Sequence, residues 1–297
     1  IRYAQGMKNE ESVNFWYYPL YFFLKLIAHL PLPVLYWLSD CLYPVVFYVI
    51  RYRKKVVFRN LRNAFPEKTE KEILILARSF YRNFCDVLVE TLKMLHFTDK
   101  ELARHIEYSN PEILLDLYNK GKSVIVVAAH YGNWEWMAGL RIRSPYHTIA
   151  VYKPLNSRIF DRIMKQLRTR FGVEVVPMRN ILRVLTRHAD QKHLTLSCFI
   201  SDQSPVKEEI QYRTTFLNQD TPVYLGIEKI AAKTNQAVVF MCPEKIRRGY
   251  YQVHITLLSE NPSSLPQHGL TELHVKMLEQ AIRREPSLWL WSHRRWK

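Results

Sequence analysis

The segment 123–129 constrains the fold more than any other part of the 297-residue chain. It reads Ser-Val-Ile-Val-Val-Ala-Ala, a short and continuous run of apolar and β-branched residues. A strand with one face in water would alternate polar and apolar side chains, whereas this run has no polar face. We therefore expect a strand that is buried on both faces, as in a parallel sheet covered by helices.

Strand and helix patterns alternate along the chain after this segment. Further strands are predicted at residues 148–152, 173–176, 194–200, 237–242 and 251–257. Helices are predicted at residues 157–170, 180–189, 223–233 and 271–284. This alternation predicts an α/β fold with a mixed, largely parallel central sheet flanked by helices.

Two Thr-x-x-Glu sequences have the spacing of a capping box, in which side chain and backbone satisfy each other at a helix start. The first, Thr69 to Glu72, precedes apolar residues that recur at helical spacing, so we expect one long amphipathic helix over residues 70–95. The second, Thr98 to Glu101, predicts a shorter helix.

Residues 13–50 are the most apolar part of the chain. Residues 32–50 carry Asp40 as their only formal charge and would span roughly 28 Å as a helix, close to a bilayer core. We expect residues 1–52 to form a membrane-anchoring helical region and residues 53–297 to form the α/β domain. A pair of buried core helices, or helices lying flat in the membrane surface, would have the same composition.

Basic residues follow the apolar region directly: Arg51, Arg53, Lys54, Lys55, Arg59 and Arg62. The positive-inside rule places this end on the cytoplasmic side, where the cluster would bind anionic headgroups. We expect no cleaved signal peptide, because the apolar region is too long and no small-residue cleavage site follows it. We do not interpret residues 1–6, which precede Met7.

The formal net charge is +16, which favours an anionic partner. Nucleic acid, a phospholipid surface and an acidic carrier protein would all satisfy this charge.

The four cysteines are spread along the chain and form no CxxC pair, so free thiols are expected. No HExxH sequence and no close set of His, Cys and Asp predicts a metal site, and we expect neither metal nor cofactor. His188 and His193 are interpreted as surface or core residues. No GxSxG serine elbow occurs, which argues against an acyl-serine hydrolase.

The sequence His130-Tyr-Gly-Asn-Trp-Glu135 directly follows the predicted buried strand. Ligands bind at the carboxyl ends of strands in open α/β sheets. We expect His130 to lie in the turn, Gly132 to relieve backbone crowding, Asn133 to cap the next helix and Glu135 to lie in its first turn.

A turn that folds back would bring the Glu135 carboxylate to the His130 imidazole. Such a pair fixes the tautomer and stabilises the imidazolium, which makes His130 a suitable general base for a hydroxyl nucleophile. The alternative is that His130 has a purely structural role, as a hydrogen-bonded histidine at the end of a strand.

The segment 130–135 resembles the HX4D/E motif of glycerolipid and lipid A acyltransferases. Four further segments, in the same order, resemble the lipid A late acyltransferase family. They are Asn60-Leu61 with Phe65-Pro66-Glu67, Tyr152-Lys153-Pro154 with Arg170, Asp202-Gln203 with Pro205, and the ending Glu285-Pro-Ser-Leu-Trp-Leu-Trp-Ser-His-Arg-Arg-Trp296. The resemblance extends over roughly residues 55–297.

The resemblance implies acyl transfer from an acyl carrier protein thioester to a hydroxyl of a phosphorylated glucosamine disaccharide. It implies an enzyme at the inner membrane with its catalytic domain on the cytoplasmic face, in contact with anionic lipids and without a nucleic-acid partner. His130 would deprotonate the hydroxyl, Glu135 would orient His130, and no acyl-enzyme would form. A monomer is the default expectation.

The resemblance also implies substrate contacts. Arg170 is expected to hold a phosphate or the oxyanion, or else to be a solvated helix charge. Asp202 is expected to orient Arg170 or a backbone turn, and Gln203 to bond substrate. A purely structural role for these two residues is the alternative. Gly132 and Asn133 are counted among the substrate-binding residues.

At the carboxyl terminus, Arg294 and Arg295 would bind phosphate near the membrane or clamp the end of the chain. Three alternatives for the function remain. The first is acyl transfer to a lysophospholipid, glycerol phosphate or phosphatidylinositol mannoside. The second is a basic nucleic-acid-binding module, and the third is a catalytically inactive membrane scaffold.

Overall fold

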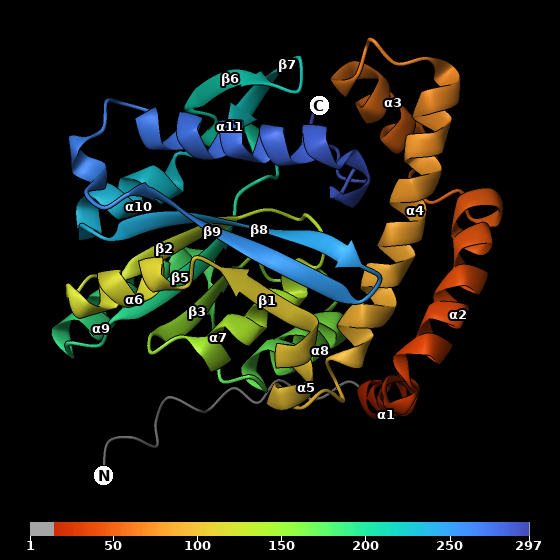
Figure 1. Ribbon diagram of the computed structural model, residues 1–297, viewed down its shortest axis with the longest axis horizontal. Coiled ribbons are helices and arrows are strands. Elements are labelled where there is room, and N and C mark those ends of the chain that lie inside the picture. Colours follow the sequence, from red (N-terminus) through yellow and green to blue (C-terminus); the bar gives the residue numbers. More distant parts are fainter. Residues whose placement is uncertain (1–14, 297) are drawn as a thin grey trace.

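The computed structural model describes residues 15–296, whose strands form a seven-stranded sheet and a separate two-stranded hairpin (Figure 1). The order in the large sheet is β1-β9-β8-β2-β5-β3-β4. Its strands are β1 (Ile106–Ser109), β2 (Val124–Ala128), β3 (His147–Tyr152), β4 (Glu174–Pro177), β5 (Thr195–Ile200), β8 (Ala237–Arg247) and β9 (Tyr250–Ser259). All neighbouring pairs are parallel except β8 and β9, so the predicted mixed, largely parallel sheet is confirmed.

Strand β2 lies at the centre of the sheet, and all five of its residues are buried. Val124 and Val126 face one apolar core, while Ile125 and Val127 face the other. The first core is covered by α6 (Glu112–Asn119), α7 (Leu140–Arg143) and α8 (Arg158–Thr169). The second is covered by α9 (Ile181–Asp190), α10 (Gly226–Thr234) and α11 (Gly269–Arg284). The uninterrupted apolar run therefore predicted a strand with helices on both sides correctly.

Both predicted capping boxes are present. Helix α4 (Glu70–Lys93) begins where the Thr69 backbone N–H donates to Glu72 Oε2 over 2.8 Å and the Glu72 N–H donates to Thr69 Oγ1 over 3.4 Å. Thr98 and Glu101 start α5 (Asp99–His105) in the same way. Figure 1 shows α4 at one end of the sheet, with the amino-terminal helices on its outer side.

The amino-terminal helices are α1 (Tyr17–His29) and α2 (Leu32–Pro44), and α2 continues into the π-helical turn Val45–Val49. Pro44, which has no N–H for the helix ladder, directly precedes this π-helical turn. Among the described residues, Leu32–Val49 is the one helix long and apolar enough to cross a membrane, and 22% of that window is buried. Membrane anchoring and the division at residue 52 stay predictions, and residues 1–14 lie outside the described part.

Helix α2 is fixed to α4 by buried polar contacts. Tyr36 donates to Glu90 Oε1 over 2.8 Å, and Ser39 donates to Asp86 Oδ1 over 2.8 Å. Arg248, in the β8–β9 turn, bonds both Asp86 and Asp40. The amino-terminal helices therefore share a polar core with the α/β domain. Helix α3 (Lys54–Ala64) follows them and also packs on α4.

The sequence pattern predicts neither strand β1 nor the hairpin of β6 (Tyr212–Phe216) and β7 (Gln219–Val223). The hairpin turn is Leu217-Asn218, with φ of 49° and 61°. Such a turn is usually marked by Asn-Gly or Asp-Gly, and neither occurs here. Because Val223 ends β7, the predicted helix 223–233 begins only at Gly226.

Candidate active site

His130 and Asp202 come together at the carboxyl edge of the sheet. His130 follows β2 and Asp202 follows β5, the neighbouring parallel strand. His130 Nδ1 lies 2.7 Å from Asp202 Oδ1, and the His130 backbone N–H donates to Oδ2 over 3.1 Å. Trp289 Nε1 donates to the same Oδ2 over 2.8 Å. Three donors therefore fix the carboxylate, and in the neutral ring Nε2 is left to accept a proton.

His130 and Asp202 differ in exposure, as is typical of a general base whose buried partner fixes its orientation. The Asp202 side chain is 3% exposed, whereas the His130 side chain is 21% exposed. Burial acts to lower the pKa of His130, but the charge and hydrogen bond of Asp202 outweigh it and raise the pKa above its ordinary value. Burial acts to raise the pKa of Asp202, and His130 with Trp289 outweighs that effect and holds it low. The Asp202 carboxylate therefore stabilises the imidazolium that forms when His130 takes up a proton.

Glu135 lies in the first turn of the following helix, as expected, but its carboxylate does not pair with His130. It lies in the 3₁₀ helix Trp134–Gly139, and Arg168 of α8 binds both of its oxygens, with Nε at 3.0 Å and Nη2 at 2.7 Å. Trp134 Nε1 adds a bond of 3.0 Å. Within residues 15–296, no hydrogen bond joins Glu135 to His130. The expected pairing is replaced by His130 with Asp202, because Arg168 takes both oxygens of Glu135.

The Glu135–Arg168 pair is buried and ionised. Burial acts to raise the pKa of Glu135, but the Arg168 charge and its hydrogen bonds outweigh it and lower the pKa. The side chains of Glu135 and Arg168 are 8% and 19% exposed, so part of the guanidinium is open. The Glu135 charge also contributes to the raised pKa of His130. Glu135 thus acts on His130 through space, without a bond.

The loop between β2 and the 3₁₀ helix is held by packing at Gly132. Gly132 has a φ of +54°, and a Cβ there would lie 2.4 Å from the Pro243 carbonyl oxygen. Its N–H donates to the Leu288 carbonyl over 3.0 Å. The expected relief of backbone crowding is confirmed. This position gives Gly132 a structural role, and the expected substrate contact of Gly132 stays a prediction.

Asn133 is fully buried, and both ends of its amide are bonded. Its Oδ1 accepts from the Trp136 N–H over 3.1 Å, which confirms the expected cap, although the helix is 3₁₀. Its Nδ2 donates to Glu90 Oε2 over 2.8 Å. Asn133 therefore fixes the loop, and the expected substrate contact is not available to it.

Glu90 connects this loop to two other parts of the molecule. Its carboxylate is fully buried and also accepts from Tyr36 of α2 and Tyr251 of β9, each over 2.8 Å. Burial raises the pKa of Glu90 despite these bonds. The sequence analysis assigned no role to Glu90, because an acidic residue within an amphipathic helix reads as a solvated one.

Arg170 does not lie beside the pair of His130 and Asp202, which we call the dyad. Its guanidinium donates to the backbone carbonyls of Leu95 and Phe97, between α4 and α5. Two residues along a helix turn the side chain by about 200°, so Arg168 and Arg170 point in nearly opposite directions. The arginine beside the site is therefore Arg168, which the sequence analysis missed. Gln203 lies beside the His130 ring, with its Nε2 3.5 Å from His130 Nε2.

The carboxyl-terminal motif packs beneath the site. Tyr131 forms a β-bridge with Trp289, and the Leu290 N–H donates to the His130 carbonyl over 3.0 Å. Asn60, from the first motif block, donates to the carbonyls of Trp291 and His293 over 2.9 Å each. The motif blocks at the two ends of the domain therefore bind each other.

Arg294 and Arg295 have different environments. Arg295 is buried, donates to the Pro222 carbonyl over 2.7 Å, and has its pKa lowered to about 10 by burial. Of the two roles expected for these arginines, phosphate binding and a structural clamp, Arg295 therefore has the second and holds the end of the chain in place. Arg294 is exposed and lines a surface hollow with Lys55, Arg59 and Trp296.

The four cysteines are free thiols, as expected. Cys198 lies in β5 and Cys242 in β8. Burial raises the pKa of Cys198 to about 12 and raises that of Cys242 as well, so both are protonated at neutral pH.

A narrow apolar cleft opens beside the loop that carries His130, between α4 and the carboxyl-terminal segment. Its apolar lining comprises Phe80, Phe84, Val87, Trp134, Leu288, Trp289 and Leu290. Gly132 forms part of its wall, so the cleft reaches the loop that carries His130.

Known proteins resemble this chain over nearly its whole length. The sequence model of the bacterial lipid A biosynthesis acyltransferase family matches residues 8–297. The lipid A biosynthesis lauroyltransferase of Escherichia coli (strain K12) is 23% identical over 278 residues, which are 92% of this chain and 89% of the relative. The lipid A biosynthesis palmitoleoyltransferase of the same strain is 20% identical over 276 residues, 92% of this chain and 88% of the relative. The chain therefore belongs to the bacterial lipid A biosynthesis acyltransferase family and is an acyltransferase.

Proposed function

We propose that this acyltransferase moves a fatty acyl chain from an acyl carrier protein thioester to a hydroxyl of a lipid A precursor, at the cytoplasmic face of the inner membrane. The observation that carries the proposal is the His130 ring, whose Nδ1 is held by Asp202 while Nε2 faces a partly exposed site. The relatives named as lauroyl and palmitoleoyl transferases of lipid A biosynthesis support the class of donor chain and acceptor.

The proposed reaction uses His130 Nε2, the ring nitrogen that Asp202 does not hold. His130 Nε2 takes the proton of the acceptor hydroxyl while its oxygen attacks the thioester carbonyl. A C–O bond forms, the C–S bond breaks, and the departing thiolate takes the proton from the imidazolium. Asp202 stabilises the imidazolium between these two steps. General-base help of this kind contributes roughly 10²–10⁴ in rate.

Arg168 and Gln203 are proposed to bind the reacting groups. The partly open Arg168 guanidinium, held by Glu135, would donate to the oxyanion of the tetrahedral intermediate or to a substrate phosphate. The Gln203 amide, 3.5 Å from His130 Nε2, lies where the acceptor hydroxyl would approach. Glu135 is thus proposed as a positioning residue for Arg168.

The apolar cleft beside Gly132 has a volume of about 20 Å³, and it is proposed to receive the carbons of the acyl chain nearest the thioester. It is lined by aromatic and aliphatic side chains and ends at the loop of the dyad. A fatty acyl chain gains roughly 0.8 kcal/mol per CH₂ on burial in such a lining. The same affinity would hold the thioester carbonyl near His130.

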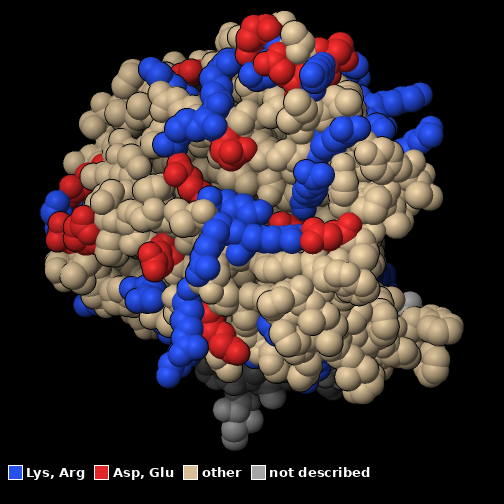
Figure 2. Space-filling view, turned by 45° about the vertical axis from the view of Figure 1, so that its right-hand side comes forward, with Lys and Arg blue, Asp and Glu red and all other residues tan. Residues whose placement is uncertain are grey.

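The amino-terminal helices are proposed to anchor the enzyme in the membrane. Their exposed apolar side chains include Phe15, Trp16, Tyr18, Phe22, Phe23, Leu26, Val34, Trp37, Val45, Tyr48, Val49 and Ile50. On the side of the molecule that carries these helices, Figure 2 shows a broad surface without charge, with lysine and arginine side chains beside it. Lys55, Arg59 and Arg294 around the surface hollow would bind headgroup or lipid A phosphates.

The proposal is tested by acyl transfer in detergent. Radiolabelled tetra-acylated lipid A precursor, with and without its sugar acids, is incubated with a panel of acyl carrier protein thioesters. The wild type should transfer, and His130→Ala should lose at least about a hundredfold. His254→Ala, an exposed histidine beside Glu244, is the matched control and should transfer normally.

Two results would count against the proposal. Transfer only to lysophospholipid or glycerol phosphate would keep the chemistry and replace the acceptor. A folded, membrane-bound wild type that acylates no acceptor would remove the proposal and favour an inactive scaffold.

A further inference from the structure

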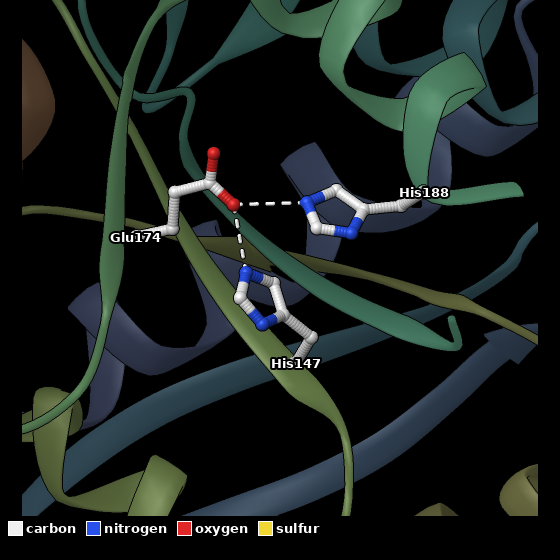
Figure 3. Close-up of side chains that lie close together, drawn as sticks. All are labelled: His147, Glu174 and His188. Carbon is white, nitrogen blue, oxygen red and sulfur yellow. Dashed lines mark hydrogen bonds and ion pairs between the residues drawn. The ribbon is translucent and has the colours of Figure 1, made fainter. Parts of the chain in front are cut away.

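Three side chains suited to metal binding converge at the edge of the sheet opposite His130. His147 is the first residue of β3, Glu174 is the first residue of β4, and His188 lies near the end of α9. Figure 3 shows both imidazole rings directed at one oxygen of Glu174. His147 Nε2 is 2.7 Å and His188 Nε2 is 2.9 Å from Oε2 of Glu174.

The donor atoms are close enough for a single ion. One ligand atom from each residue lies within 4.8 Å of the others. Ligands of tetrahedral zinc stand at roughly 2.0–2.2 Å from the metal, and therefore about 3.3 Å from each other. Each nitrogen would have to move about half an ångström away from Oε2, and the two nitrogens, which lie within 4.8 Å of each other, would settle at the same spacing. The ion would replace the protons that now lie between rings and carboxylate.

The surroundings hold the carboxylate in the required orientation. Arg187 Nη2 donates to Glu174 Oε1 over 2.9 Å, which leaves Oε2 to the two rings. Metal-binding carboxylates commonly have such an outer partner. The His188 side chain is 7% exposed, whereas those of Glu174 and His147 are 29% and 40% exposed. The site is thus anchored on one side and open on the other, where the ion enters and water completes its coordination.

We propose that His147, Glu174 and His188 bind one divalent ion of the zinc type, which ties β3, the edge strand β4 and helix α9 together. Two imidazoles and one carboxylate suit zinc and its neighbours, whereas magnesium and calcium prefer oxygen ligands alone. Strands β2 to β5 are parallel, so this site at their amino ends faces away from the dyad at their carboxyl ends. The ion is therefore structural and takes no part in acyl transfer.

The test is metal binding by tag-free, chelator-stripped enzyme in detergent. Cobalt(II) absorption and competition with a chromophoric zinc chelator measure stoichiometry and affinity. The wild type should bind one zinc per chain at this site, and zinc should raise its melting temperature by several degrees. His147→Ala and Glu174→Gln should each weaken binding at least about tenfold and abolish the thermal shift.

Two controls keep the result interpretable. His254→Ala removes a histidine that faces one carboxylate and no second ring, and it should bind zinc like the wild type. His147 is the main variant because its exposed side chain tolerates truncation better than that of the buried His188, and circular dichroism checks its fold. Magnesium should give no thermal shift.

Equal zinc binding by the wild type and His147→Ala would overturn the proposal. A folded wild type that takes up no zinc would also overturn it and leave the cluster as a hydrogen-bonded staple. A magnesium shift as large as the zinc shift would contradict the assignment of the ion class.

Discussion

The two edges of the parallel strands carry histidine clusters built in opposite ways. At the carboxyl edge, one carboxylate, Asp202, accepts from a single ring and two N–H groups. His130 Nε2 has no carboxylate partner there, and the Gln203 amide lies 3.5 Å from it. At the amino edge, one carboxylate oxygen of Glu174 serves the Nε2 atoms of both His147 and His188. A ring nitrogen without a carboxylate partner can act as a general base. Two rings that converge on one carboxylate oxygen can form a metal site or a hydrogen-bonded cluster. The partner of each nitrogen, more than the presence of histidine, decides the chemistry.

The largest contrast is expected between His130→Ala and His147→Ala. The first should lower acyl transfer by roughly 10²–10⁴, because it removes the proposed general base. The second should leave transfer in the folded enzyme within about twofold of the wild type, since its ring lies at the opposite edge. Single-turnover transfer with saturating acceptor measures both. A large loss in His147→Ala, at an unchanged melting temperature, would show that the two edges are not independent.

Asp202→Asn should lose almost as much, roughly 10²–10⁴ at neutral pH, because the imidazolium loses its counter-charge. The variant should also change the pH profile. In the wild type, Asp202 holds the pKa of His130 above its ordinary value, so the neutral base is depleted as pH falls through that raised pKa. Without the charge, burial dominates and lowers the pKa, so the acidic limb of kcat/KM should move to lower pH. An unmoved limb would mean that Asp202 does not set the His130 pKa.

A smaller effect is expected at the second ion pair. Glu135→Gln keeps the shape of the side chain but removes the charge that holds Arg168, and a hydrogen bond to a charged group is worth roughly 1.5–3 kcal/mol. Transfer should therefore fall about 10–100-fold. Arg168→Ala should be at least as slow.

Arg170→Ala is the matched control on the same helix. Its side chain holds carbonyls between α4 and α5, so the change should lower the melting temperature more than the rate of the folded enzyme. If Arg170→Ala proved slower than Arg168→Ala at equal folded fraction, the assignment of the two arginines would have to be reversed.

Gly132→Ala tests the packing that supports the dyad. Its φ of +54° costs an L-residue about 1–2 kcal/mol, and the new Cβ would meet the Pro243 carbonyl oxygen at 2.4 Å. Gly121→Ala, with a φ of +68° and nothing within 4 Å of its Cβ, carries the conformational cost alone. Urea unfolding should therefore show a larger loss of unfolding free energy in Gly132→Ala than in Gly121→Ala. Acyl transfer should fall only in Gly132→Ala. An equal loss of unfolding free energy in the two variants would show that the loop at Gly132 moves to accommodate the new Cβ.

Sequence reasoning reached the fold through features that act locally. The apolar run at 123–129 has no polar face, and two capping boxes mark helix starts, so β2, α4 and α5 follow from neighbours in the chain. The hairpin at Leu217-Asn218 escaped because its left-handed turn contains no glycine.

The site was only half predictable for the same reason. His130 could be found, because ligands gather where a buried strand ends. Its partner could not, since Asp202 is 72 residues away and reaches His130 only because β2 and β5 are neighbours. The acid in the local motif, Glu135, was the nearer candidate and proves to be held by Arg168. The amino-edge cluster combines three elements and has no local spacing to read.

The central claim is that Asp202, and not Glu135, holds the His130 ring. It is tested most directly by nuclear magnetic resonance of ¹⁵N-histidine-labelled enzyme in detergent, with His130→Ala to assign the signal. The account predicts a downfield Nδ1 proton on His130 that disappears in Asp202→Asn and persists in Glu135→Gln. Loss of that proton in Glu135→Gln, with its retention in Asp202→Asn, would contradict the account and restore the pairing expected from the local motif.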